Sequence, residues 1–378
     1  MHVPDGFINA PVSVAAGVVA AAAVGVSLRG ARRELADERA APLAGLVAAF
    51  VFAVQMLNFP VAAGTSGHLL GGALAAILVG PYTGVLCISV VLLMQGVLFA
   101  DGGLTALGVN ITVMGVVTVL VSYGIFRGLV RVLPRGRRRS VTVSAFVAAL
   151  VSVPAAAAFF TLIYAIGGTT DVPVGKVLTA MVGVHVLIGI GEAAITALTV
   201  SAVLAVRPDL VHGARGLAAP LKLRVGGELV DAPAPEKASG TVRVPVAARS
   251  VRKVWGVGLL SALVLAGVVS FYASASPDGL EKVAADQGID KNVREHAAAN
   301  SPLADYGVKD IGNARLSGGL AGVIGVGVTV AVGSGIFWAV RKRRDEESSG
   351  ASGASGASGA SGASGASGAS GASDRTAV

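Results

Sequence analysis

The first two residues of the chain, Met1 and His2, carry most of a metal chelator. The amine of Met1, the amide nitrogen of His2 after loss of its proton, and Nδ1 of the His2 ring can close two fused chelate rings around one divalent cation. Nitrogen ligands in one plane suit Ni(II), Cu(II) or low-spin Co(II), whereas Zn(II) prefers a tetrahedron. The opening pair therefore predicts a transition-metal site; the alternative is a chance Met-His start with no role.

This chelator requires a free amine on Met1. Methionine aminopeptidase acts when the second residue is small, and His2 is large, so we expect Met1 to be retained. The same requirement excludes a cleaved signal peptide.

The composition predicts an integral membrane protein. Hydrophobic residues make up 53% of the 378 residues and charged residues only 14%, and the mean hydropathy is +0.74. A water-soluble globule of this composition would expose extensive apolar surface. The single cysteine, Cys87, lies within an apolar run, so an intrachain disulfide is excluded and a packing role is expected.

Nine apolar stretches are candidates for crossing a bilayer, which takes about 20 helical residues each. The third is short and ends at Gly80-Pro81, so we expect a broken or tilted span, and the seventh is long enough to tilt strongly. The predicted fold class is an all-α integral membrane protein, a polytopic helix bundle of about seven spans followed by a C-terminal two-span module. The nine stretches cover residues 8–28, 41–60, 67–80, 82–100, 105–126, 141–166, 176–206, 254–273 and 317–340.

The basic residues predict the orientation of the bundle, because lysine and arginine in short loops are retained in the cytoplasm. Basic residues follow the first, fifth, seventh and ninth stretches, whereas segments 60–68 and 100–104 contain none. With the N-terminus outside and the C-terminus in the cytoplasm, every basic cluster is cytoplasmic. The net charge of +8 then reflects topology and not a nucleic-acid surface. The clusters are Arg29, Arg32, Arg33 and Arg39; Arg127, Arg131, Arg135, Arg137, Arg138 and Arg139; Arg207; and Arg341, Lys342, Arg343 and Arg344.

A second histidine falls on the same predicted side as Met1 and His2. His68 follows the segment 64–67, whose small residues let the backbone enter the bundle and approach other chains closely. His68 is therefore the predicted fourth nitrogen ligand, and a capping or packing role is the alternative.

Four motifs together resemble the CbiM/NikM family, the substrate-binding membrane components of energy-coupling factor transporters for cobalt and nickel. They are the opening Met-His-Val-Pro-Asp-Gly-Phe, the segment 64–69, the glycine-containing run 94–110, and the stretch 184–192. The resemblance covers about residues 1–210. It implies that Met1, His2 and His68 hold Co(II) or Ni(II) as the transported substrate. It also implies a transmembrane coupling protein and cytoplasmic ATPase subunits as partners, in the plasma membrane of a prokaryote.

The C-terminal part resembles the two-span CbiN/NikN-type accessory component, through the sequence Pro-Asp-Gly-Leu-Glu at 277–281. The alternative is an unrelated helical hairpin. We expect the acidic loop of this module to attract a cation. His296 either contacts metal or is a solvated surface histidine. The acidic residues are Asp278, Glu281, Asp286, Asp290, Glu295, Asp305 and Asp310.

Four regions are expected along the chain. A metal-binding membrane domain spans 1–206, and a cytoplasmic linker spans 207–253. A two-span module with an extracytoplasmic loop covers 254–340, and a disordered cytoplasmic tail with Gly-Ala-Ser repeats covers 341–378.

Polar residues in apolar surroundings are candidates for orienting the metal ligands, since ionisable groups in a membrane usually face a bundle interior. His185 and Glu192 are seven residues apart and share one helix face, where we expect a structural network rather than direct ligation. Each of the other candidates is alternatively a helix cap. They are Asp5, Asn58, Gln95, Asp101 and Asn110.

The first predicted span repeats small residues at every fourth position, which permits close helix approach in a membrane. This stripe either docks the coupling subunit or packs against the protein's own helices. It consists of Ser13, Gly17, Ala21 and Gly25.

An enzyme is disfavoured. The sequence contains neither the phosphate-binding G-x-x-x-x-G-K-[ST] pattern, so we expect no ATP site, nor the H-E-x-x-H pattern of zinc peptidases. The predicted function is that of the substrate-binding component of an energy-coupling factor transporter that imports Co(II), Ni(II) or both. We expect membrane lipids to surround the protein. The alternative is an ATP-independent secondary transporter or channel for a divalent metal, although the two halves show no internal repeat.

Overall fold

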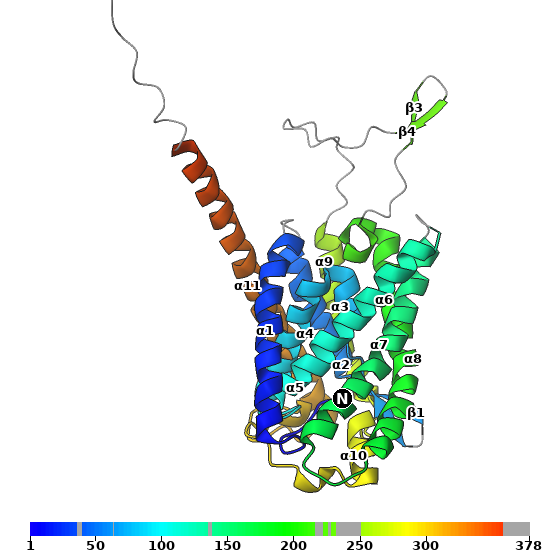
Figure 1. Cartoon of the computed structure of the whole chain (residues 1–378), viewed down its shortest axis with the longest axis vertical. Helices are drawn as coiled ribbons and strands as arrows, with labels where there is room; N and C mark the ends of the chain where they lie inside the picture. Colours follow the sequence, from blue (N-terminus) through cyan, green and yellow to red (C-terminus); the bar gives the residue numbers. More distant parts are fainter. Residues whose placement is uncertain are drawn as a thin grey trace, which may run out of the picture.

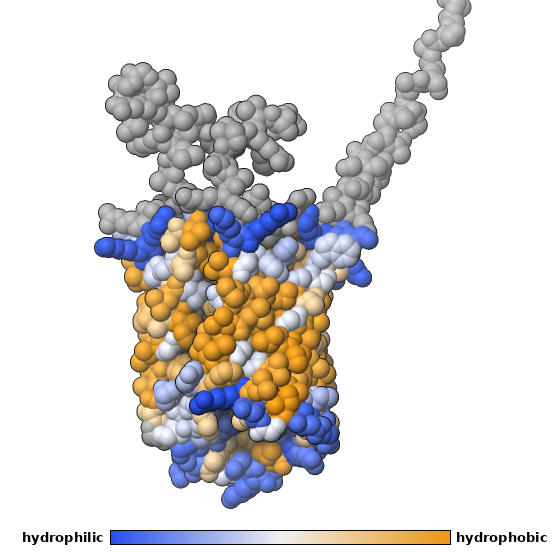
Figure 2. Space-filling model, turned by 180° about the vertical axis from the view of Figure 1, so that it is seen from behind, coloured by the Kyte–Doolittle hydropathy of each residue, from blue (hydrophilic) through white to orange (hydrophobic). Residues whose placement is uncertain are grey.

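The computed structural model describes residues 1–35, 40–62, 64–134, 138–215, 222–225, 228–231 and 251–357, and this part of the chain is predominantly helical (Figure 1). Seven of its helices are long and apolar enough to cross a membrane. On the face shown in Figure 2, a broad apolar band covers the helical body, with hydrophilic residues at both ends. The predicted class of all-α polytopic membrane protein is confirmed.

The long helices account for seven of the nine predicted spans. The connections between helices contain the short helix α10 (Gly279–Gln287) and 3-10 turns over Pro208–Leu210, His212–Ala214, Asp290–Asn292 and Ala304–Tyr306. The long helices are α1 (Ala10–Glu34), α4 (Pro81–Leu98), α5 (Leu107–Asn110) joined to α6 (Thr118–Val132) by a π-helical turn over Ile111–Val117, α7 (Arg138–Gly167), α8 (Val174–Val206), α9 (Val251–Gly267) extended by a 3-10 turn over Val269–Tyr272, and α11 (Ala314–Ala357).

The second and third predicted spans are not long helices. The second is the shorter helix α2 (Ala40–Gln55), after which the chain forms an antiparallel hairpin of β1 (Phe59–Ala62) and β2 (Thr65–Gly67). The third is an extended stretch followed by the short helix α3 (Gly72–Val79). A continuous span over 41–60 is therefore wrong, because the helix ends at Gln55 and Pro60 enters a strand. The third stretch is broken as expected, and the break lies where Gly71 adopts a left-handed φ of +85°.

The segment from His68 to Gly80 still crosses the bundle. His68 contacts the amine of Met1 at one end of α1, whereas a Cβ on Gly80 would lie 2.4 Å from the carboxyl carbon of Glu34 at the other end. We call these the Met1 end and the Glu34 end of the molecule. Every residue of α3 is buried, so a crossing made of extended chain and two helical turns is enclosed by protein.

An interrupted backbone inside a membrane protein needs polar partners, because lipid offers none. The Glu192 carboxylate on α8 accepts hydrogen bonds from the amides of Leu70 (2.6 Å) and Gly71 (3.1 Å). Gln55, the last residue of α2, donates from Nε2 to the carbonyl of Leu70 at 2.9 Å. Two buried polar side chains thus stabilise the break that precedes α3.

The C-terminal module packs against the rest of the bundle. Helices α9 and α11 contact α2 and each other, and one buried apolar cluster includes Phe52, Phe99, Leu280 and Phe337. The loop between α9 and α11, with α10, lies at the Met1 end beside β1 (Figure 1). The two predicted parts therefore share one hydrophobic core.

Several sequence expectations fall on residues outside the described part. They include residues 358–378 of the tail and most of the linker. The described parts of the linker are 207–215, a hairpin of β3 (Lys222–Val225) and β4 (Glu228–Asp231), and residues 251–253, which begin α9. Helix α11 continues to Ala357, past residue 341 where the tail was expected to begin. Arg39, Arg135 and Arg137 also lie outside the described residues.

Candidate metal centre

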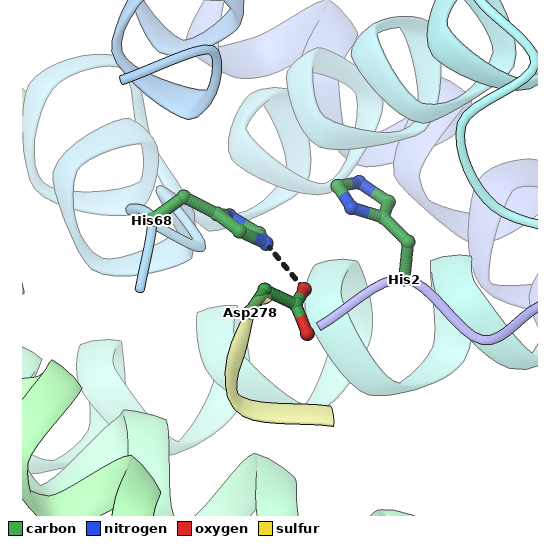
Figure 3. A group of neighbouring side chains, drawn as sticks. All are labelled: His2, His68 and Asp278. Atoms are coloured by element: carbon green, nitrogen blue, oxygen red, sulfur yellow. Dashed lines mark ion pairs between the residues drawn. The ribbon is translucent and has the colours of Figure 1, made fainter. Parts of the chain in front are cut away.

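Nitrogen and oxygen atoms from three distant parts of the chain meet at the Met1 end. One ligand atom each from His2, His68 and Asp278 lie within 4.8 Å of one another, and Figure 3 shows their side chains directed toward a common space. The Met1 nitrogen contacts Nε2 of His68 and lies 2.8 Å from Oδ2 of Asp278. That same oxygen lies 3.4 Å from His68 Nε2.

His68 is oriented with a lone pair toward the cluster. Its Nδ1 lies 3.0 Å from the carbonyl oxygen of Leu69. A carbonyl only accepts hydrogen bonds, so Nδ1 carries a proton, and in the neutral ring the lone pair is on Nε2. A metal-binding histidine with its second nitrogen bonded to a carbonyl is held in one tautomer and one ring orientation.

The His2 ring stacks on the ring of His68, with 5.0 Å between centroids and 19° between planes. Its Nδ1 lies 3.2 Å from Asp101 Oδ1 and its Nε2 lies 3.2 Å from Gln95 Oε1. Burial lowers the pKa of His2 to about 4, against the opposing attraction of Asp101. The ring is therefore neutral near pH 7, so only one of its nitrogens carries a proton and the other has a lone pair. For Nδ1 to join the predicted chelate, it must exchange the contact with Asp101 for a metal.

The backbone after His2 is fixed by paired hydrogen bonds. The Val3 amide donates to Asn110 Oδ1 at 2.8 Å, and Asn110 Nδ2 donates back to the Val3 carbonyl at 3.1 Å. Asn110 directly precedes the π-helical turn, a feature that is frequent at functional sites. The carboxylate of Asp5 accepts from the amide of Thr105 at 2.8 Å. A Cβ on Gly103 would lie 2.3 Å from the Asp5 nitrogen, so only glycine permits this close approach.

A cavity of about 380 Å³ adjoins the cluster. Asn58 lines it, and Oδ1 of Asn58 is buried without a hydrogen-bond partner among the described residues. Four carboxylates also line the cavity, a setting that attracts cations. They belong to Asp101, Asp278, Glu281 and Asp305.

Tyr306, from the C-terminal module, completes the surroundings of His2. Its hydroxyl donates to Asp101 Oδ2 at 2.6 Å and accepts from Gln95 Nε2 at 2.9 Å. Burial and the neighbouring Asp101 raise the pKa of Tyr306 well above its usual value, so the hydroxyl keeps its proton. Tyr306 also has a φ of +56°, a left-handed conformation that is costly for a bulky residue and that suggests a functional constraint.

Asp278 is the N-cap of α10. Its Oδ1 accepts from the amides of Leu280 (2.7 Å) and Glu281 (2.9 Å), while the Glu281 carboxylate accepts from the Asp278 amide at 2.9 Å. Burial raises the pKa of the Asp278 carboxyl, but the Met1 ammonium and His68 outweigh burial and hold that pKa well below its usual value. Asp278 is therefore ionised, with Oδ2 directed at the two nitrogens.

Residues 2–210 match the family of the cobalt uptake substrate-specific transmembrane region, CbiM, which is more than half of the chain. The chain belongs to the CbiM family. Residues 252–342 match the PDGLE domain, so a CbiM/NikM-type region is fused to a CbiN-like module.

Three relatives show the extent of the similarity. A putative metal transport protein of Haloquadratum walsbyi is 42% identical over 211 residues, which are 56% of this chain and 93% of the relative. A putative fused nickel transport protein NikMN of Archaeoglobus fulgidus is 40% identical over 56% of this chain and 68% of its own length. The fused nickel transport protein NikMN of Rhodobacter capsulatus is 32% identical over 88% of this chain and 95% of its own length. The last relative therefore covers both the CbiM-type region and the module.

The remaining candidate residues of the CbiM-type region, and His296 of the module, lie in different places. Gln95 and Asp101 contact His2, and Asn110 and Asp5 bind the N-terminal backbone, as described above. Glu192 binds the backbone before α3. His185 is buried in α8, where its Nδ1 lies 2.7 Å from the Met181 carbonyl and its Nε2 has no hydrogen-bond partner within the described residues. His296 Nε2 lies 3.0 Å from the Gly102 carbonyl.

The stripe of small residues on α1 of the CbiM-type region divides between two environments. A Cβ on Gly108 would lie 2.4 Å from the Cα of Gly17, so Gly17 takes part in internal packing. Ala21 is exposed, and a Cβ on Gly25 would meet nothing within 4 Å. Ser13 donates to the Ile8 carbonyl at 3.4 Å.

Sequence reasoning placed Asp278 in an acidic loop but did not predict its contact with Met1 and His68, and it did not select Tyr306. The N-cap pattern of Asp278 with Glu281 three residues later was visible and fixes where α10 begins. No signal in the sequence indicated that this helix start would face the first residue of the chain.

Proposed function

We propose that this protein is the substrate-binding component of an energy-coupling factor transporter that imports Co(II) or Ni(II). The observation that carries the proposal is the convergence of the Met1 amine, the His2 ring and His68 Nε2 in a buried cluster beside an acidic cavity. The cobalt uptake family and the names of the related nickel transport proteins support the same substrate class.

The proposed ligands are the Met1 amine, the His2 amide nitrogen, His2 Nδ1 and His68 Nε2. Two protons leave as the cation enters, one from the Met1 ammonium and one from the His2 amide, so binding tightens as pH rises. Four nitrogens in one plane suit Ni(II) and low-spin Co(II). Release then requires a movement that separates His68 from the N-terminus or a proton returned to the amide.

The proposed orientation places the Met1 end outside the plasma membrane of a prokaryote and the C-terminus in the cytoplasm. Arg29, Arg32 and Arg33 lie near the Glu34 end of α1, and Arg131 lies in the last turn of α6. A basic end is retained in the cytoplasm. The cation would then arrive at the metal centre from the extracytoplasmic side.

Energy would come from partners, namely a transmembrane coupling protein and cytoplasmic ATPase subunits. The outer face of α1 is available for docking, since Val14 and Val18 are 66% and 65% exposed. Replacing the exposed Ala21 by Trp should reduce co-purification of the ATPase subunits without changing metal affinity. Full co-purification of the Ala21→Trp variant would show that this face is not the docking surface.

The experiment that tests the metal centre compares Co(II) and Ni(II) binding by two extended forms of the full chain. One carries a single extra residue before Met1, confirmed by intact mass, which blocks the amine and shifts His2. The control carries the same residue after Val378. Loss of binding in the first form alone supports the proposal, whereas equal affinity in both forms contradicts it. Metal uptake without any associated ATPase would favour a secondary transporter instead.

A further inference from the structure

The fused PDGLE module places a carboxylate against two of the nitrogens assigned to the metal. Asp278 Oδ2 lies 2.8 Å from the Met1 nitrogen and 3.4 Å from His68 Nε2, and the Asp278 side chain is 11% exposed. We propose that Asp278 is a further metal ligand, which holds the Met1 ammonium in the metal-free protein and the cation in the loaded protein. This inference rests on the proposed function.

The position of Asp278 relative to His68 is fixed by the backbone. The amide of Ser66, two residues before His68, donates to the Pro277 carbonyl at 2.9 Å, and the Ser66 hydroxyl donates to the Ser276 carbonyl at 2.7 Å. These bonds join β2 to the residues directly before Asp278. The cluster is therefore built jointly by the CbiM-type region and the module.

The carboxylate itself is oriented by α10. Because Oδ1 caps the first turn of this helix, Oδ2 is left facing the two nitrogens. A Cβ on Gly279 would lie 2.8 Å from Cδ1 of Ile188, so α10 begins in close contact with α8. The capping bonds to Oδ1 and the backbone bonds to the residues before Asp278 both fix this side chain, so Oδ2 is a preorganised oxygen ligand.

Charge balance gives Asp278 a role in both states. In the metal-free protein, its negative charge neutralises the positive Met1 ammonium. In the loaded protein, a divalent cation, one deprotonated amide and one carboxylate also sum to zero, since the amine and both imidazoles are neutral. Without Asp278 the buried chelate would carry a net positive charge, which is costly away from water. The second nearby carboxylate, Asp101, accepts from Tyr306 and does not replace this contact.

The inference is tested by Asp278→Asn in the full chain, with Asp305→Asn as matched control. Asn is as good an N-cap as Asp, so α10 should be retained. Both substitutions remove one negative charge from the same cavity. We expect Asp278→Asn to weaken Co(II) and Ni(II) binding by about 100-fold and Asp305→Asn by less than about threefold. Equal, small effects of the two substitutions would overturn the inference.

A second measurement detects the ligand directly. In the Asp278→Cys variant loaded with Co(II), X-ray absorption should show a sulfur neighbour at about 2.3 Å from the metal, a typical metal–thiolate distance. Asp305→Cys should show none, and the native Cys87 is buried in α4. Loaded Asp278→Cys protein without sulfur in its metal coordination would overturn the inference.

His68→Ala separates this inference from the proposed function. If His68→Ala binds metal as the native chain does, the proposed centre itself is wrong. If His68→Ala abolishes binding while the Asp278 variants behave like their Asp305 controls, the centre stands and only the role of Asp278 fails.

Discussion

At the scale of single residues, the chemistry depends on nitrogen atoms that keep their lone pairs. His68 presents Nε2 to the cluster because its Nδ1 proton is directed to the Leu69 carbonyl, and the residue is 4% exposed. Met1 and His2 reach it because Asn110 and Asp5 hold the backbone that follows. The N-terminal pair is thus part of the folded structure and not a loose chelating tail.

His68→Ala should weaken Co(II) and Ni(II) binding by at least about 100-fold, because it removes one of four nitrogens from a preorganised set. His296→Ala is the control, since His296 lies at the same end and contacts the Gly102 carbonyl. Calorimetric titration of both variants measures the difference. Native affinity in purified, folded His68→Ala protein would exclude His68 as a ligand.

The docking of the N-terminal segment should depend on pH through His2. Its pKa is lowered from 6.5 to about 4, so between these values the undocked segment binds a proton that the docked segment does not. Docking therefore has its full stability above pH 6.5 and loses it as pH falls toward 4. The pKa of Asp278 is lowered well below 3.8, so protonation of Asp278 affects docking only below about pH 3.8, outside this window.

Hydrogen exchange of the Val3 amide, which donates to Asn110, measures this loss. Its protection should fall across that window in metal-free protein, while the Gly80 amide, bonded to the Ala76 carbonyl at the Glu34 end, should show only the intrinsic pH dependence of exchange. A His2→Asn variant should lose the difference. Constant protection of Val3 relative to Gly80 would argue against His2 as the titrating group.

The nitrogen ligands could be predicted from the sequence because Met1 and His2 are adjacent and His68 lies in a glycine-containing loop on the same predicted side. Asp278 and Tyr306 could not, because they reach the cluster only through the docking of a separate module. The contact of Asp278 with Met1 spans 277 positions of the chain. Local patterns carry no information about such a contact.

At the scale of elements, the break before α3 places His68. Hydropathy predicted the long helices, because each is a continuous apolar run of sufficient length. It failed over 41–60, where apolar side chains continue while the backbone changes from helix to strand, and at 67–80 it indicated a broken span without locating the break. Glu192, which stabilises this break, lies 122 positions from Leu70 in the sequence, so the break could be expected only from the shortness of the third stretch.

Glu192→Gln should loosen the segment that carries His68, because a neutral amide binds the Leu70 and Gly71 amides less strongly. We expect metal affinity to fall by about 10-fold or more. Glu34→Gln is a matched control, since Glu34 accepts from the amide and hydroxyl of Thr83 at the opposite end. Both variants should unfold at lower temperature, but equal metal affinities would show that Glu192 does not position His68.

At the scale of the whole molecule, the fused module is part of one core. A Cβ on Gly325 of α11 would lie 2.2 Å from the ring of Phe52 on α2, and one on Gly322 would lie 2.3 Å from the Ala266 carbonyl of α9. The module loop then returns to the metal centre through Asp278 and Tyr306. Close packing within the bundle therefore fixes where two of the functional side chains lie.

Gly325→Leu should destabilise the protein by about 1–3 kcal/mol, because the larger side chain overpacks the contact with Phe52. Gly327→Leu is the control on the same helix, since a Cβ there meets nothing within 4 Å. The thermal unfolding temperatures of both variants, measured in the same detergent, test the prediction. Equal temperatures would show that α11 and α2 are not tightly packed.

The complete burial of α3 also has a consequence for biogenesis. A segment enters the membrane independently when it has about 20 apolar residues, whereas α3 has eight. Of its neighbours, α2 is synthesised before it but α4, α6, α7 and α8 are synthesised after it, so α3 can be fully enclosed only once α8 has been made. We therefore expect the order of assembly to differ from the order of synthesis, and His68, which leads into this segment, to reach its place only after α8 has been made.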